Sequence, residues 1–173
     1  GEFKADRNNI PRTWCDHGAW PVFVLNFYLN QTGDFSILDK EITYWKDRFV
    51  ERSKKIDNKF QMAQGHFQRQ SNGATYTASI LEHLIIQQLT SFYNVNNKNV
   101  LLLEGADWND TYDMARENGG SVCFYNFYAN NFLVLSAILK ELKKNGSTHI
   151  TLLEEVTMLL DNLPGQQKVD YQS

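Results

Sequence analysis

One short stretch of the sequence carries the residue types that acid–base chemistry needs. Residues 101–113 read LLLEGADWNDTYD, in which an apolar run leads directly into four carboxylates placed around Trp108; the four are Glu104, Asp107, Asp110 and Asp113. A carboxyl group can give or take a proton in a reaction, and an indole offers a flat face to a ring-shaped ligand. Asn109-Asp110-Thr111 is equally able to form a capped turn. The stretch therefore predicts either a sugar site or a structural turn.

The composition favours a carbohydrate ligand over several other classes. Aromatic residues make up 13% of the chain, and many of them stand beside Asn, Asp or Gln. Aromatic faces can stack on sugar rings while amides and carboxylates bond sugar hydroxyls. The acidic stretch lacks the spacing of a calcium loop, and the two cysteines and four histidines lack zinc spacing. We therefore predict no metal site. The glycines at 119 and 120 lack the Lys-Ser/Thr of a phosphate loop.

Charge and length exclude further classes. The 173 residues suffice for one domain, with 17 basic against 20 acidic residues and a net charge of -3. No basic cluster is present, so we expect no nucleic-acid partner. No apolar run approaches the ~20 residues of a membrane span, so we expect no membrane partner either. With only Cys15 and Cys123 available for a disulfide, a reduced, cytoplasmic protein is expected.

Helical spacing of apolar residues predicts an all-α fold. We expect helices over 17–30, 36–49, 74–93, 121–144 and 148–162, with a long connection over 51–72. Pro21 suits a first helical turn, and Gly33 and Asn145-Gly146 suit helix ends. Residues 1–16 read as an extended lead-in that opens with a remnant of cloning, 17–163 as one helical domain, and 164–173 as a polar tail.

The order of the expected helices suggests their arrangement. Helices 17–30 and 121–144 are apolar on nearly all faces, and each is followed by an amphipathic one. Inner helices ringed by outer ones give this alternation, which predicts helical hairpins forming part of an (α/α)6 toroid. A chain with so few hairpins leaves inner helices partly uncovered. We therefore expect a homo-oligomer that buries parts of 17–30 and 121–144.

Four segments in the same order resemble a known enzyme family. GADWND at 105–110, DHGAWP at 16–21, TGDFSILD at 32–39, and the pairs Glu82-His83 and Ser121-Val122 resemble motifs of the inverting glycoside phosphorylases that include cellobiose and chitobiose phosphorylases. The resemblance spans roughly residues 12–145. It implies a glycosyltransferase with an (α/α)6 barrel, which cleaves a β-linked glucose disaccharide or oligosaccharide with inorganic phosphate and no other cofactor.

The resemblance also assigns roles to individual residues. Asp110 would be the general acid, which protonates the leaving oxygen while phosphate attacks. Trp108, Asp107, Asp16 and Arg12 would bind the donor sugar. The crowding of carboxylates in this loop would help to keep one of them protonated near neutrality. The family's phosphate-binding residues lie further downstream than Pro164, so we expect this chain to be an inactive fragment by itself.

Two alternatives stay open. The first is an inverting glycoside hydrolase or glucan-processing domain on the same barrel. The second is a non-catalytic fragment that binds sugar or has only a structural role. The nearly apolar surroundings of His17 and His83 favour structural roles for both histidines, and the aromatic stripe over 124–132 favours a place in the core.

Overall fold

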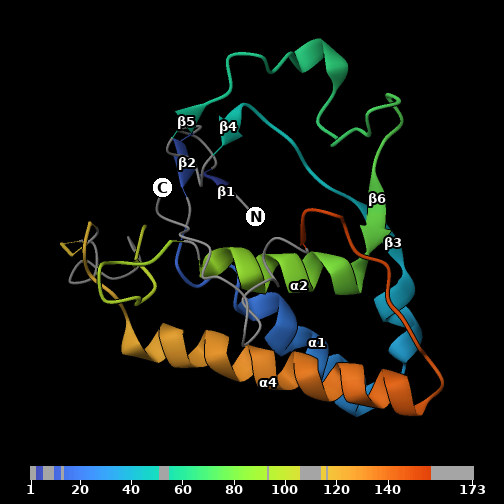
Figure 1. Ribbon diagram of the computed structural model, residues 1–173. Coiled ribbons are helices and arrows are strands. Elements are labelled where there is room, and N and C mark those ends of the chain that lie inside the picture. The colour runs from blue at the N-terminus through green and yellow to red at the C-terminus, as the bar shows by residue number, and fades with distance from the viewer. Residues whose placement is uncertain are drawn as a thin grey trace, which may run out of the picture.

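The computed structural model describes residues 3–5, 10–12, 14–50, 55–92, 94–105, 114–115 and 117–156. Three helices lie together on one side of it: α1 (Trp20–Thr32), α2 (Ile80–Ser91) and α4 (Val122–Lys144). Short strands and turns extend away from these helices, as Figure 1 shows. The helices form the core. Residues 35–50 and 55–79, called the extension below, supply one wall of the candidate site.

Local signals fix the ends of α1. Pro21 occupies its first turn, where no intrahelical N–H is needed. Gly33 ends it in the left-handed conformation at φ 66°, and the Gly33 N–H donates to the Leu29 carbonyl oxygen at 2.8 Å. The helix expected over 17–30 is therefore confirmed, with its start at Trp20.

Serine caps start the other two helices. Ser79 Oγ accepts a hydrogen bond from the Glu82 N–H at 3.1 Å, and Ser121 Oγ accepts from the Phe124 N–H at 3.3 Å. Lys143 and Lys144 lie in the last turn of α4, where positive charge suits the helix dipole. The helix expected over 121–144 is confirmed, while the one expected over 74–93 is shorter than predicted.

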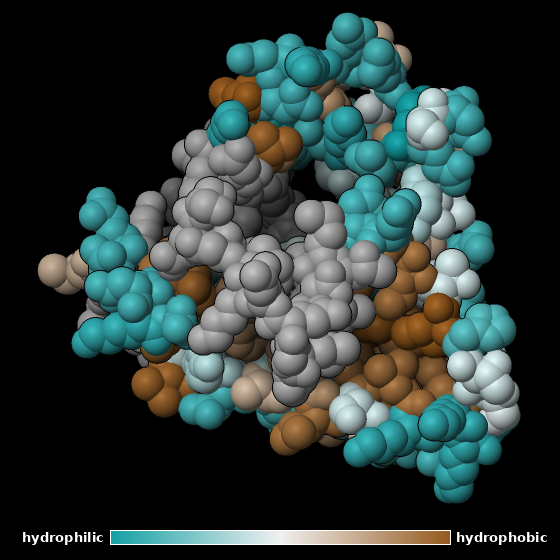
Figure 2. All heavy atoms as spheres, in the orientation of Figure 1, coloured by the Kyte–Doolittle hydropathy of each residue, from teal (hydrophilic) through white to brown (hydrophobic). Residues whose placement is uncertain are grey.

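The main hydrophobic core lies between these three helices. α1 contributes Val22, Leu25 and Leu29, and the other helices contribute aliphatic side chains from their facing sides. The remaining buried members are Leu81, Leu84, Ile85, Leu135, Ile138, Leu38 and Val156. Figure 2 shows apolar side chains gathered on the side where α2 and α4 run, and mainly hydrophilic ones over the extension.

The described chain also forms three small antiparallel sheets. β1 (Phe3–Ala5) pairs with β2 (Ile10–Arg12), with Phe3 opposite Arg12. β3 (Glu41–Thr43) pairs with β6 (Thr77–Ser79), with Ile42 opposite Ala78. β4 (Phe49–Val50) pairs with β5 (Lys55–Ile56). Two 3-10 turns, Phe35–Asp39 and Met62–Gln64, complete the extension.

The all-α expectation is therefore wrong, because the fold is mixed α/β. Asp34 caps only the turn Phe35–Asp39, where its carboxylate accepts from the Ser36 N–H at 3.1 Å. The chain then enters β3, whose pairing with β6 outweighs the helical spacing of apolar residues over 36–49. Ile42 and Trp45, which that helix would have buried, are 44% and 63% exposed.

The toroid is wrong for a related reason. Inner and outer helices cannot alternate, because 36–49 is not a helix and residues 147–153 form neither helix nor strand. The expected helix 148–162 is thus absent over its described first part, and residues 157–163 lie outside the described residues. α1 is not wholly buried either, since Val24 and Phe27 are largely exposed.

Among the described helices, α4 alone has the length and apolar composition that could cross a membrane.

One buried carboxylate ties the extension to the helices. Glu82 on α2 is 1% exposed and accepts hydrogen bonds from Tyr44 Oη at 3.0 Å and Tyr76 Oη at 3.0 Å. Its second oxygen accepts from the Leu153 N–H at 2.8 Å. Burial and the Glu82 charge raise the pKa of Tyr76 to about 12 and also raise the pKa of Tyr44. Both phenols therefore remain donors at physiological pH.

This arrangement makes Glu82 a sensitive position. We expect Glu82→Ala to lower the free energy of unfolding by about 1–3 kcal/mol or more, because several donors lose their acceptor in a buried place. Glu41→Ala is the matched control, since Glu41 is exposed and accepts one hydrogen bond from Thr77 Oγ1 at 2.9 Å. Urea denaturation measures both variants. Equal losses in the two variants would contradict the role given to Glu82.

Candidate functional site

The turn at residues 14–19 is held by buried polar side chains from two helices. Tyr128 Oη donates to the Cys15 carbonyl oxygen at 2.8 Å, and Asn131 Nδ2 donates to the Ala19 carbonyl oxygen at 2.8 Å. Gln88 Nε2 donates to the Gly18 carbonyl oxygen, and its Oε1 accepts from Asn131 Nδ2 at 3.1 Å. Buried carbonyls require such partners. The turn is therefore fixed to α2 and α4 together.

Gly18 allows this close approach. A Cβ at residue 18 would lie 2.6 Å from Tyr128 Oη and 3.2 Å from Ser91 Oγ. Any side chain there would push the turn away from α4 and weaken the hydrogen bond to Cys15. The glycine is thus required by packing, with no need for an unusual backbone conformation.

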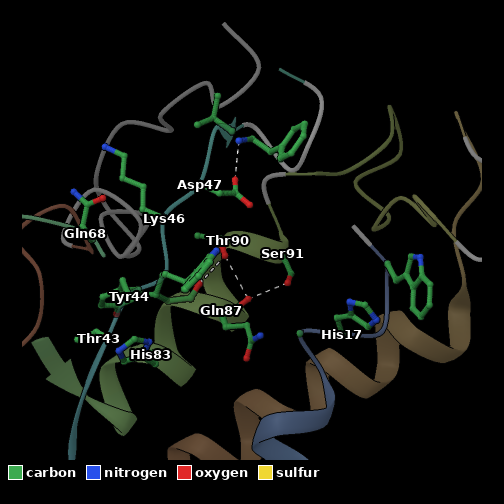
Figure 3. A pocket seen from close by; sticks show the side chains of 16 residues that line it. His17, Thr43, Tyr44, Lys46, Asp47, Gln68, His83, Gln87, Thr90 and Ser91 are labelled. Carbon is green, nitrogen blue, oxygen red and sulfur yellow. Dashed lines mark hydrogen bonds between the residues drawn. The ribbon is translucent and has the colours of Figure 1, made fainter. Parts of the chain in front are cut away.

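The fixed turn presents two rings to a cavity. Trp14 and His17 have ring centroids 4.6 Å apart and both line a cavity of about 660 Å³. The other walls come from residues 43–50, from α2 and from Gln68. Figure 3 shows His17 on one side of the cavity and Thr43, Tyr44 and Lys46 on the other, with Gln87, Thr90 and Ser91 between them. This volume lies in the range of small-molecule sites.

Aromatic rings form much of the wall opposite the turn. The Tyr44 ring stacks on His83 with centroids 3.7 Å apart, and its hydroxyl is bound to Glu82. Trp45 stacks on His66 at 4.5 Å with nearly parallel planes, yet the indole remains 63% exposed. A flat, fixed and exposed indole in the wall of a cavity is suited to stacking on a ligand.

The α2 side of the cavity carries hydroxyl, amide and imidazole groups. Ser91 Oγ donates to the Gln87 carbonyl oxygen at 2.9 Å, and Thr90 Oγ1 donates to the Ile86 carbonyl oxygen at 2.8 Å. Because the helix carbonyls take these protons, both oxygens remain as acceptors for a ligand. Partial burial lowers the pKa of His83, whose Nε2 donates to the Ile42 carbonyl oxygen at 3.3 Å. His83 is therefore neutral at physiological pH.

The start of the acidic stretch lies beside the same turn. Trp14 forms isolated backbone bridges with Glu104 and Gly105. Glu104 is buried, has a φ of 55°, and accepts a hydrogen bond from Asn94 Nδ2 at 2.5 Å. A non-glycine residue with positive φ is strained, and such strain is common where a loop serves a site. Asp107, Trp108 and Asp110 lie outside the described residues.

The remaining sequence-predicted residues have different surroundings. Asp16 lies in the turn, where its Oδ2 accepts from Trp20 Nε1 at 2.9 Å. Asp16 Oδ1 is buried without a partner among the described residues. Arg12 lies at the end of β2. The turn thus places Asp16 near the start of the acidic stretch, while it directs His17 toward the cavity.

Sequence reasoning missed the aromatic and helical walls of the cavity. The sequence alone predicts no site role for Tyr44, Trp45 or Gln87, and it favours structural roles for His17 and His83. A usable signal was the string TYWKD at 43–47, whose mixture of aromatic and polar residues is typical of a sugar site. Over the part of the chain that the structure describes, no three His, Cys, Asp or Glu side chains are grouped to hold a metal ion.

Comparison with known proteins gives one weak similarity. No family model matches this chain. Over 151 residues the chain is 21% identical to phospholipase B-like 1 of Bos taurus. The matched region covers 86% of this chain and 25% of that protein. The chain therefore spans about a quarter of the length of the curated relative that it matches.

This result corrects the expected family. The resemblance to cellobiose and chitobiose phosphorylases rested on short ordered motifs, and the comparison found no such enzyme but a weak similarity to a phospholipase B-like protein. Over the residues that the structure describes, the mixed fold also forms no helical barrel of the kind on which a glycosyltransferase of that family is built. The assignment as a glycoside phosphorylase is therefore not supported.

The packing around Gly18 can be tested by a double-mutant cycle. We expect Gly18→Ala to lower the free energy of unfolding by about 1–3 kcal/mol, because the new methyl group collides with Tyr128 Oη. In a Tyr128→Phe background the penalty should be clearly smaller, since the colliding oxygen is gone. Tyr125→Phe is the control background, in which the Gly18→Ala penalty should stay unchanged. Thermal and urea denaturation give the four corners of each cycle, and additive effects with Tyr128→Phe would contradict the described contact.

Proposed function

We propose that this chain binds a carbohydrate in the cavity between residues 14–19, residues 43–50 and α2, and that it is part of an enzyme that hydrolyses a glycosidic bond. The observation that carries the proposal is the lining of the cavity. Exposed aromatic faces and neutral hydrogen-bonding groups surround one space of about 660 Å³. Ring stacking and neutral hydrogen bonds are the two interactions that a sugar offers most.

The charges around the cavity support a neutral, hydroxyl-rich ligand. Lys46 and Asp47 are the charged lining residues, and they are neighbours of opposite sign in the chain. Asp47 Oδ1 already accepts from the Phe49 N–H at 2.7 Å. A strongly anionic ligand would need more positive charge than this lining supplies.

Bond cleavage stays a prediction that depends on the acidic stretch. Asp110 is proposed as the general acid, with Asp107 and Trp108 beside the sugar, and all three lie outside the described residues. Support comes from the bridges between Trp14 and the start of that stretch, because they bring Glu104 and Gly105 next to a wall of the cavity. An inverting hydrolase also needs a second carboxylate to activate water. Among the described residues, Asp47 is the carboxylate that lines the cavity and could take this role.

A similarity, not a geometric feature, favours a second candidate function. The matched protein is named phospholipase B-like 1, which suggests hydrolysis of a phospholipid ester. The serine that lines the cavity gives this candidate little help, because Ser91 Oγ donates to a carbonyl of its own helix. The carbohydrate proposal therefore comes first.

Binding can be tested at the exposed indole. We expect the chain to bind cello- or laminari-oligosaccharides, and Trp45→Ala to weaken binding about tenfold because a stacking face is lost. Phe27→Ala is the matched control, since Phe27 is a 54% exposed aromatic side chain on α1 that does not line the cavity. Calorimetric titration measures all three proteins. Equal losses in the two variants, or no binding by the unchanged chain, would contradict the proposal.

Cleavage requires a separate measurement with the full-length protein that contains this chain. Release of reducing sugar in phosphate-free buffer, abolished by Asp110→Asn, is the expected result. Release of fatty acid from phosphatidylcholine micelles, without action on oligosaccharides, would instead establish the second candidate. A fully active Asp110→Asn variant would remove Asp110 from the chemistry.

A further inference from the structure

Helix α1 exposes an apolar stripe on the side away from the core. The residues of this stripe follow the spacing of one helix face and are 36–62% exposed; they are Trp20, Phe23, Val24, Phe27 and Tyr28. The opposite face of the same helix buries Val22, Leu25 and Leu29. A helix with apolar side chains on both faces normally has a partner on both. Within the described residues the core face is covered, whereas the outer face meets Phe127 of α4 near Trp20 and Phe23 and stays partly exposed along its length.

The stripe is held in one shape by its own ring contacts. Phe23 and Phe27 meet edge to face at 4.8 Å, and Trp20 and Phe23 do so at 5.9 Å. Phe127 of α4 joins them, with its centroid 5.2 Å from that of Trp20 and 5.5 Å from that of Phe23. Because these rings are already ordered, a partner would cost little side-chain entropy on binding. The stripe is therefore a preformed surface that continues onto α4.

The polar atoms at the two ends of the stripe are already satisfied. Trp20 Nε1 donates to Asp16 Oδ2 at 2.9 Å, and Tyr28 Oη donates to Asp34 Oδ2 at 2.7 Å. The surface left for a partner is thus apolar, with an acid at each end. An interface core that is rich in aromatic residues and poor in charge is typical of stable protein association.

The charges around the stripe favour a protein partner over a lipid surface. Residues 13–39 contain no Lys or Arg, while Asp16, Asp34 and Asp39 are acidic. Helices that lie on membranes usually carry basic residues along their polar face, because these attract anionic lipids. The other polar side chains of α1 are uncharged: Asn26, Asn30, Gln31 and Thr32.

We propose that the occupant is a second copy of this chain, which binds stripe to stripe across a two-fold axis that passes near Val24. Val24 lies at the middle of the stripe and is its most exposed member, at 62%. The five side chains expose on the order of 400–500 Å² per copy, given the 150–250 Å² that an aromatic side chain offers. Two stripes, each continued by Phe127 of α4, then approach the roughly 1,000–1,200 Å² at which specific interfaces begin. Between its two acidic ends the stripe carries no charge, so this central part can pack against its own copy, as an isologous contact requires.

Sedimentation equilibrium from 1 to 100 µM on the chain tests the proposal. We expect a dimer whose dissociation constant rises at least tenfold in Val24→Glu, because the dimer would bury a charge at its centre. Leu133→Glu is the matched control: Leu133 is 71% exposed on α4 and is not part of the stripe, so its replacement should leave the dimer unchanged. Circular dichroism and thermal unfolding of each variant show whether it folds like the unchanged chain.

A disulfide test reports on the geometry without adding a charge. In a Cys123→Ser background, Val24→Cys should give a cross-linked dimer on mild oxidation, since the two-fold axis brings the two copies of residue 24 together. Leu133→Cys in the same background should give none. A monomer at all concentrations would overturn the proposal, as would a dimer that Val24→Glu leaves intact. Binding of a monomeric chain to phosphatidylcholine vesicles, lost in Val24→Glu, would also overturn it and assign the stripe to a lipid surface.

Discussion

Three carbonyl groups in the turn before α1 are buried, and the hydrogen bonds that satisfy them organise the rest of the molecule. Tyr128 and Asn131 reach the turn from α4, and Gln88 reaches it from α2. Since a buried carbonyl without a donor is costly, the turn can occupy this place only when both helices are present. The aliphatic core supplies most of the cohesion, whereas this polar network sets where the helices stand relative to the turn. The position of Trp14 and His17 at the cavity follows from it.

Helices governed by local signals could be read from the sequence. Pro21 and Gly33 mark the ends of α1, and Ser121 and Asn145 mark those of α4, because each acts within one helical turn. The segment 36–49 could not be read in this way. Its apolar spacing suits a helix, but strand β3 forms because residues 77–79 lie beside it, and that pairing joins distant parts of the chain. Periodicity carries no information about such a partner.

The residues of the candidate site divide in the same way, into those that the local sequence indicates and those that only the fold brings together. The acidic stretch is identifiable from the sequence because its residue types are unusual in their local context, whereas Asp16 is a candidate only through the family resemblance. His17 and His83 gained interest only when the fold placed them around one cavity with Tyr44 and Gln87. Short motifs also gave a family resemblance that comparison over 151 residues did not support. Residue types can thus suggest a kind of chemistry, but the walls of a cavity are a product of tertiary structure.

Glu82 has a consequence for how this protein can change over generations. Its carboxylate is shared by Tyr44 and Tyr76, which come from either end of the extension, and by a backbone N–H near residue 153. Loss of the acid would leave both phenols without their acceptor, and loss of either phenol would leave the acid with one donor fewer. Positions 44, 76 and 82 therefore behave as one heritable unit, so related sequences should keep all three residues or replace them together.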